Sequence, residues 1–139
     1  MSSENFNAIF TQEVLEKLFP KERTDHFFDA LFGDAEEGAY DIALKFKGNN
    51  KEMLEFEFHL NQRPGKCLAC HLTHGLPQVF LRHPVLNIKG LIQDIDSLLN
   101  GKARCKEWQL GVTRELSKKI HVIPFTVFLN HETDSLNVL

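Results

Sequence analysis

The chain has 139 residues, a net charge of −3 and no cluster of Lys or Arg residues. This length fits a single domain, spanning 1–139, with one hydrophobic core. The charge distribution argues against nucleic acid or an anionic membrane surface as a partner, and the apolar runs are too short to span a bilayer.

Residues 1–7 have neither the basic region nor the apolar stretch of a secretory signal, so we expect a cytoplasmic protein. In that compartment, the three cysteines favour metal binding, redox chemistry or simple burial over structural disulfides. The 12 Phe residues, against one Tyr and one Trp, can build a substantial core without requiring hydrogen-bond partners.

The first part of the chain predicts two helices. Thr11 is a suitable N-cap for a helix over 12–19. Thr24 stands in the same position before a second helix, which Gly33 ends.

A β-hairpin follows, because apolar and polar side chains alternate over 40–47 and again over 54–61. Gly48-Asn49-Asn50 supplies the turn. In the second strand, one face is expected to be buried and consists of Leu54, Phe56, Phe58 and Leu60. The other face is expected to be exposed to solvent and consists of Glu55, Glu57, His59 and Asn61.

The segment 62–86 is irregular, and Asn87 then caps a helix that Gly101 ends. The residues of this helix predicted to contact the sheet are Ile88, Leu91, Ile95 and Leu98. A strand is expected around Trp108, and the apolar run 120–129 predicts a central strand with a bulge or an edge at Pro124.

This order of elements predicts an α+β fold, in which two β-hairpins form an antiparallel sheet and helices pack on one face. A loop-rich Cys/His insertion separates the first hairpin from the long helix. The alternating βαβ units of a doubly wound sheet are missing from the pattern, and so are dinucleotide-binding and P-loop motifs.

The insertion carries the most distinctive chemistry of the chain. Its candidate metal ligands stand at i, i+3, i+4 and i+7, and they are Cys67, Cys70, His71 and His74. Two thiolates from a Cys-x-x-Cys pair are a common half of a zinc site. The residues considered as additional ligands are Cys105, His59 and His83.

Three other interpretations compete with zinc. The string Cys67-x-x-Cys70-His71 matches the haem attachment motif of c-type cytochromes, but such attachment normally takes place outside the cytoplasm, which disfavours haem. A Cys-x-x-Cys pair also serves thiol redox chemistry, and Ile123-Pro124-Phe125 resembles the proline segment of thioredoxin-like proteins, although a hairpin precedes the cysteines here instead of a βαβ unit. Finally, the cysteines can be packing residues.

Two further groups have a functional and a structural interpretation. His59 beside Glu55 and Glu57 forms either a general-base pair or a solvated sheet face. The basic residues that flank the Cys segment either bind an anionic ligand or keep a loop soluble, and they are Arg63, Lys66 and Arg82.

These observations lead to three hypotheses. The favoured one is a module that binds a protein or small-molecule ligand and holds its insertion with a zinc site. The alternatives are a thiol-dependent oxidoreductase and a structural or chaperone-like domain that forms a homodimer through apolar surface. The sequence does not indicate a reaction, and non-enzymatic binding is the expectation.

Overall fold

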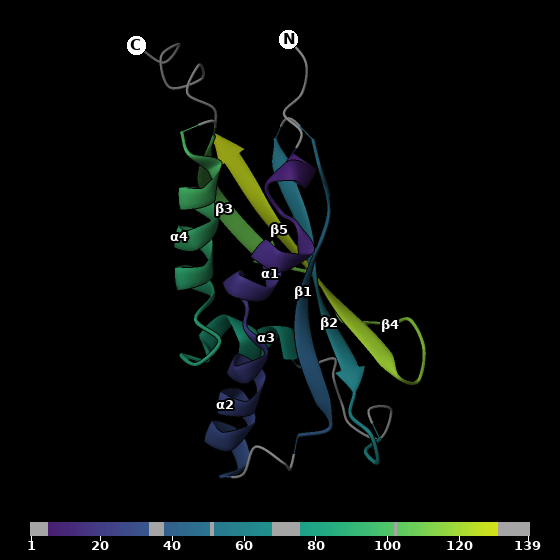
Figure 1. Cartoon of the computed structure of the whole chain (residues 1–139). Coiled ribbons are helices and arrows are strands. Elements are labelled where there is room, and N and C mark those ends of the chain that lie inside the picture. The colour runs from purple at the N-terminus through teal and green to yellow at the C-terminus, as the bar shows by residue number, and fades with distance from the viewer. Residues whose placement is uncertain (1–5, 34–37, 51, 68–75, 102, 131–139) are drawn as a thin grey trace.

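The computed structural model describes residues 6–33, 38–50, 52–67, 76–101 and 103–130. The strands within these ranges are β1 (Tyr40–Asn49), β2 (Met53–Gln62), β3 (Arg104–Leu110), β4 (Arg114–Glu115) and β5 (Ile120–Asn130). They form one antiparallel sheet in the order β1–β2–β5–β3, and β4 pairs with β5 on the same side as β3. Figure 1 shows the helices gathered on one side of this sheet. The predicted α+β class is therefore confirmed, with β1–β2 and β4–β5 as hairpin-like pairs.

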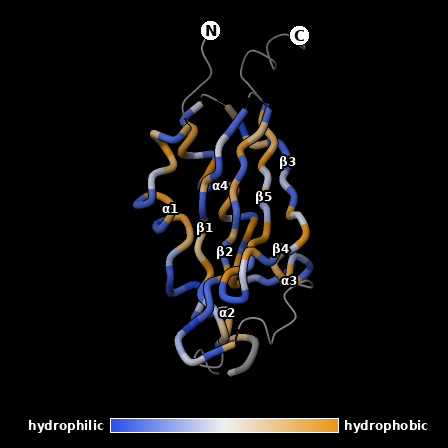
Figure 2. Tube along the Cα trace, turned by 90° about the vertical axis from the view of Figure 1, so that its right-hand side faces the viewer, coloured by the Kyte–Doolittle hydropathy of each residue, from blue (hydrophilic) through white to orange (hydrophobic). Residues whose placement is uncertain are grey.

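The alternation along β2 sets the two faces of the sheet as predicted. Leu54, Phe56, Phe58 and Leu60 are all buried beneath the helices. Glu55 on the opposite face is exposed. In the sheet seen face-on, hydrophilic and hydrophobic residues alternate along the neighbouring strands (Figure 2). A period of two in the sequence therefore becomes one core face and one open face.

Strand β5 is central, as its two-sided apolar composition predicts, and the sheet accommodates Pro124 without an edge position. The Pro124 carbonyl accepts a hydrogen bond from Gly111 N–H at 2.8 Å, so the backbone of Pro124 faces the side of β3 and β4. Strand β3 ends at Leu110 and β4 begins at Arg114. The N–H that proline lacks thus falls in the gap between these two strands, where no ladder partner is needed.

Two helices precede the sheet. Helix α1 (Gln12–Leu18) has the predicted N-cap, since Thr11 Oγ1 accepts a hydrogen bond from Val14 N–H at 3.2 Å. Helix α2 (Lys21–Phe32) begins directly after Pro20 and ends at Gly33, whose φ of 78° is left-handed. The prediction that Thr24 caps α2 is wrong. Thr24 lies inside the helix, and its side chain bonds to β1 instead.

The insertion contains a helix that the sequence did not predict, α3 (Leu76–Arg82), whose first turn accommodates Pro77. Helix α4 (Ile88–Leu99) has Asn87 as its N-cap, as predicted. Leu98 was wrongly assigned to its contact face, because it is 36% exposed whereas Leu99 is fully buried. None of the described helices is long and apolar enough to cross a membrane.

Candidate functional site

The Cys/His insertion leaves the sheet at the end of β2. Its residues 62–67 are described; Cys67 is exposed, and its sulfur is disulfide-bonded. Cys70, His71 and His74 lie outside the described residues. Among the residues that are described, no three His, Cys, Asp or Glu side chains form a group that could hold a metal ion. The predicted ligand set therefore remains a prediction.

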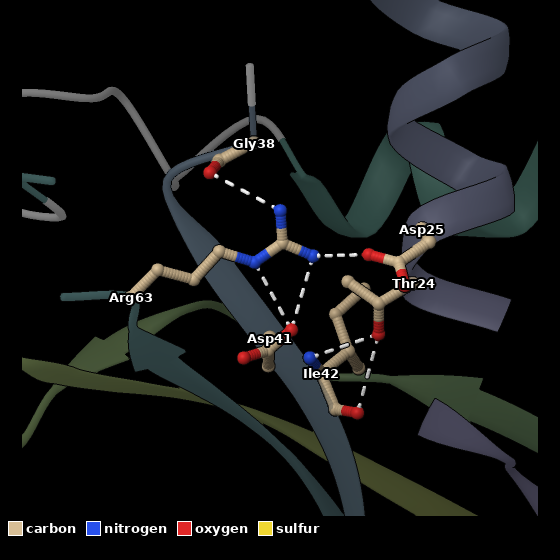
Figure 3. A network of polar contacts seen from close by, with 6 residues as sticks. All are labelled: Thr24, Asp25, Gly38, Asp41, Ile42 and Arg63. Atoms are coloured by element: carbon tan, nitrogen blue, oxygen red, sulfur yellow. Dashed lines mark hydrogen bonds and ion pairs between the residues drawn. The ribbon is translucent and has the colours of Figure 1, made fainter. Parts of the chain in front are cut away.

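Arg63 fixes the chain where it leaves β2, four residues before Cys67 (Figure 3). Its Nη2 donates to Asp25 of α2 at 2.7 Å, and its Nε donates to Asp41 of β1 at 3.0 Å. Its Nη1 donates to the Gly38 carbonyl at 3.4 Å, and the guanidinium lies over the ring of Phe28, 5.3 Å from the ring centroid. The Arg63 side chain is only 14% exposed, so this guanidinium is engaged by the protein's own groups.

The second half of the insertion, from α3 onward, is fixed on the same helix. Phe27 of α2 packs edge-on against Phe80 of α3, with ring centroids 6.0 Å apart, and against His83 at 4.8 Å. Nδ1 of His83 accepts a hydrogen bond from Val85 N–H at 3.2 Å. A neutral His83 ring therefore carries its hydrogen on Nε2. Two adjacent residues of α2, Phe27 and Phe28, thus contact both the beginning and the second half of the insertion.

The neighbouring basic residues differ in their surroundings. Lys66 and Arg82 are exposed. Lys66 and Arg63 line an open pocket of about 520 Å³ together with Lys21, Asp25, Asp41 and Pro64. Because Asp25 and Asp41 already pair with Arg63, the lysines are the cations of this pocket that remain for an anionic ligand.

Cys105 lies far from the insertion. It pairs with Leu129 in β5, near the beginning of β2, whereas Cys67 follows the end of that strand. Most of the length of β2, roughly 30 Å for ten extended residues, lies between them. Burial raises the pKa of the Cys105 thiol to about 12, and the Asp96 carboxylate adds to this rise through its charge and a hydrogen bond. The structure therefore does not bring Cys105 to Cys67.

His59 lies on the open face of the sheet, as predicted, and contacts a carboxylate. Its Nε2 is 2.9 Å from Oε1 of Glu57, and the other Glu57 oxygen accepts a hydrogen bond from Arg114 at 3.3 Å. Because an ionised carboxylate can only accept, a neutral His59 carries its hydrogen on Nε2 and offers Nδ1 as the proton acceptor. A general base requires a ring nitrogen that can accept a proton, and this tautomer provides one.

The prediction that Glu57 is exposed is wrong, since its side chain is only 12% exposed. Arg114 comes from β4, on the far side of β5, and reaches across β5 to Glu57. Val122 lies between His59 and Arg114 in the sheet and is fully buried. The sequence offers no signal for this contact, because residues 57 and 114 meet only through the sheet order.

Comparison of the chain with known protein families, with curated proteins and with solved structures gave no match.

Proposed function

We propose that this protein is a small binding module whose insertion, residues 62–86, binds a zinc ion through Cys67, Cys70, His71 and His74. The observation that carries this proposal is the double attachment to α2. Arg63 at the beginning of the insertion contacts Asp25 and Phe28, and Phe80 and His83 in its second half contact Phe27. An insertion that is attached at two points to adjacent residues of one helix has less conformational freedom to lose when its ligands are organised.

The chemistry of the ligand set suits zinc. Thiolate sulfur binds Zn²⁺ at about 2.3 Å and imidazole nitrogen at about 2.0–2.1 Å, and four such ligands complete a tetrahedral structural site. Only reduced, deprotonated cysteines bind the ion, so the disulfide at Cys67 must first be reduced. Cys105 does not compete for the ion, because its thiol is held protonated near Asp96.

The test is the zinc content of protein purified without a polyhistidine tag, reduced with a phosphine and dialysed against zinc. We expect about one zinc per chain, lost in Cys67→Ser/Cys70→Ser and retained in the matched variant Cys105→Ser. A chelator should lower the melting temperature of the wild type and leave the double variant unchanged. Equal zinc content in all three proteins contradicts the proposal.

The contribution of the Arg63 contacts to zinc binding can be tested separately. Arg63→Gln removes the contacts to Asp25 and Asp41, and it should weaken zinc binding while leaving the ligands in place. Arg82→Gln, an exposed position at the end of α3, is the matched control and should bind zinc as the wild type does. Identical affinity in both variants would show that the attachment to α2 does not organise the site.

A second function is favoured by one specific observation, the disulfide at Cys67, which suits a thiol–disulfide oxidoreductase. In that case, the reduced protein should contain a thiol with a pKa well below the usual value of roughly 8.5, measured as the pH dependence of alkylation. Zinc bound with ordinary thiol reactivity favours the binding module. A reactive thiol without bound zinc favours the oxidoreductase.

A further inference from the structure

Strand β1 is an edge strand, and its backbone groups point alternately to β2 and away from it. Arg63 N–H donates to the carbonyl of Ala39 at 2.9 Å, so odd-numbered residues of this part of the chain pair with β2. Ile42 and Leu44 therefore direct their N–H and C=O groups outward, away from the sheet. An outward-facing row of this kind is a template for pairing with another extended chain.

At Ile42 the protein occupies this row itself. The Thr24 hydroxyl of α2 accepts a hydrogen bond from Ile42 N–H at 3.1 Å and donates to Ile42 C=O at 3.4 Å (Figure 3). A single side chain thus takes the place of a neighbouring strand. At Leu44, the next outward position, no hydrogen bond to the backbone groups comes from any described residue. Leu44 as a whole residue is only 3% exposed, and an outward N–H and C=O without a protein partner are the groups that an added extended chain pairs with.

Leu44 also lines a pocket. This pocket has a volume of about 460 Å³ and lies where α1 turns into α2 against the edge of β1. The side chains of Leu15 and Phe19 form part of its apolar wall, and its charged residues are Glu16, Lys21, Glu22 and Asp41. Since Asp41 is paired with Arg63, the remaining charges are two carboxylates and one ammonium. The pocket therefore favours a positively charged ligand.

We propose that this pocket binds a short extended peptide segment with a Lys or Arg residue opposite Leu44. An extended residue offers one C=O and one N–H on the same side, which match the two outward groups of Leu44. Its side chain then lies on the helix-covered face of the sheet, on the side of Glu16. This site is separate from the proposed zinc site, and either proposal can fail without the other.

The structure favours a short peptide over a second copy of this chain. Thr24 closes the edge at Ile42, and the register of β1 shifts between Phe46 and Gly48. Continuous pairing is therefore confined to the region of Leu44. The ten-residue β1 of a second copy could not form a full ladder there, whereas a segment of about three residues needs only one exchange of two hydrogen bonds.

The probe is the peptide acetyl-Val-Lys-Val-amide, titrated into the full chain while the Leu44 amide is followed by NMR. Two N-methylated versions form a matched pair. Methylation at Lys removes the N–H that faces Leu44, whereas methylation at the C-terminal Val removes an N–H that points away from the protein. We expect the first to weaken binding about tenfold and the second to have little effect.

Charge recognition is tested with protein variants. Glu16→Gln/Glu22→Gln should weaken binding of this peptide but not of the uncharged analogue in which norleucine replaces Lys. Glu13→Gln, an exposed position on α1 outside the pocket, should change the binding of neither peptide. Three results would overturn the proposal: an unperturbed Leu44 amide at millimolar peptide, equal binding of the two methylated peptides, or protection of Leu44 by concentration-dependent dimerisation of the protein alone.

Discussion

The side-chain oxygen of Asn87 accepts a hydrogen bond from Gly90 N–H at 3.2 Å, and a Cβ at position 90 would lie only 2.3 Å from the Asn87 amide nitrogen. The cap of α4 is therefore adapted to a glycine in its first turn. Asn87 itself has a left-handed backbone with a φ of 47°, which Asn and Gly tolerate better than other residues.

This relationship predicts different costs for two substitutions. Asn87→Ala loses the cap and places a Cβ-bearing residue without a polar side chain in the left-handed region, so it should destabilise the protein by about 2 kcal/mol. Asn87→Gly relieves the left-handed backbone and should cost only a few tenths of a kcal/mol. Urea unfolding measures both. Equal effects would show that the left-handed backbone contributes nothing.

The contact between Thr24 and β1 predicts the effect of an isosteric change. Thr24→Val keeps the shape of the side chain and removes both hydrogen bonds to Ile42, which leaves a buried N–H and C=O unpaired. We expect a loss of about 1–3 kcal/mol in the free energy of unfolding. Thr126→Val, on the open face of β5, is the matched control and should be nearly neutral. A similar loss in both variants would contradict the assigned role of Thr24.

Phe58 is the centre of an aromatic cluster, in which its ring contacts Phe19, Phe80 and Phe125 at centroid distances of 5.5, 5.5 and 5.3 Å. It is fully buried. Phe58→Ala should lower the free energy of unfolding by about 3–5 kcal/mol, as aromatic deletions in cores do. Glu55→Ala, three residues earlier on the open face, should change it by less than about 0.5 kcal/mol. Denaturant unfolding of both variants checks the assignment of the two faces.

The raised pKa of Cys105 predicts that the stability of the folded protein depends on pH. Because burial and Asp96 raise its pKa to about 12, the folded protein holds this proton more tightly than the unfolded chain does. The resulting stabilisation is complete below the ordinary thiol pKa of roughly 8.5 and declines as the pH rises towards 12. In a Cys67→Ser/Cys70→Ser background, iodoacetamide at mildly alkaline pH should therefore modify Cys105 far more slowly in the folded state than in urea.

The contribution of Asp96 to this protection can be isolated. Asp96→Asn removes the negative charge and retains an oxygen that can accept the hydrogen bond from Cys105 N–H, which is 2.8 Å long in the wild type. Alkylation of Cys105 should become faster but stay slower than in urea, because burial is the larger cause of the raised pKa. An unchanged rate would show that the carboxylate has no influence on the thiol.

Local patterns in the sequence were sufficient for most of the fold. The alternation over 54–60 predicted which side of β2 is buried, because successive strand residues point to opposite faces whatever the partners are. Thr11, Asn87 and the glycines at 33 and 101 marked helix ends, because caps and left-handed residues satisfy the backbone locally. The candidate zinc ligands also rest on spacing alone.

The remaining features depend on pairs of residues distant in the chain, and only the tertiary structure decided them. Thr24 has the sequence context of a cap but bonds to a strand that begins many residues later. Arg114 reaches Glu57 because β5 lies between their strands, and Arg63 joins α2 to β1 because the end of β2 meets both. Such contacts follow from sheet order and helix placement, which are set by burial of the whole core and leave no periodic trace in the sequence.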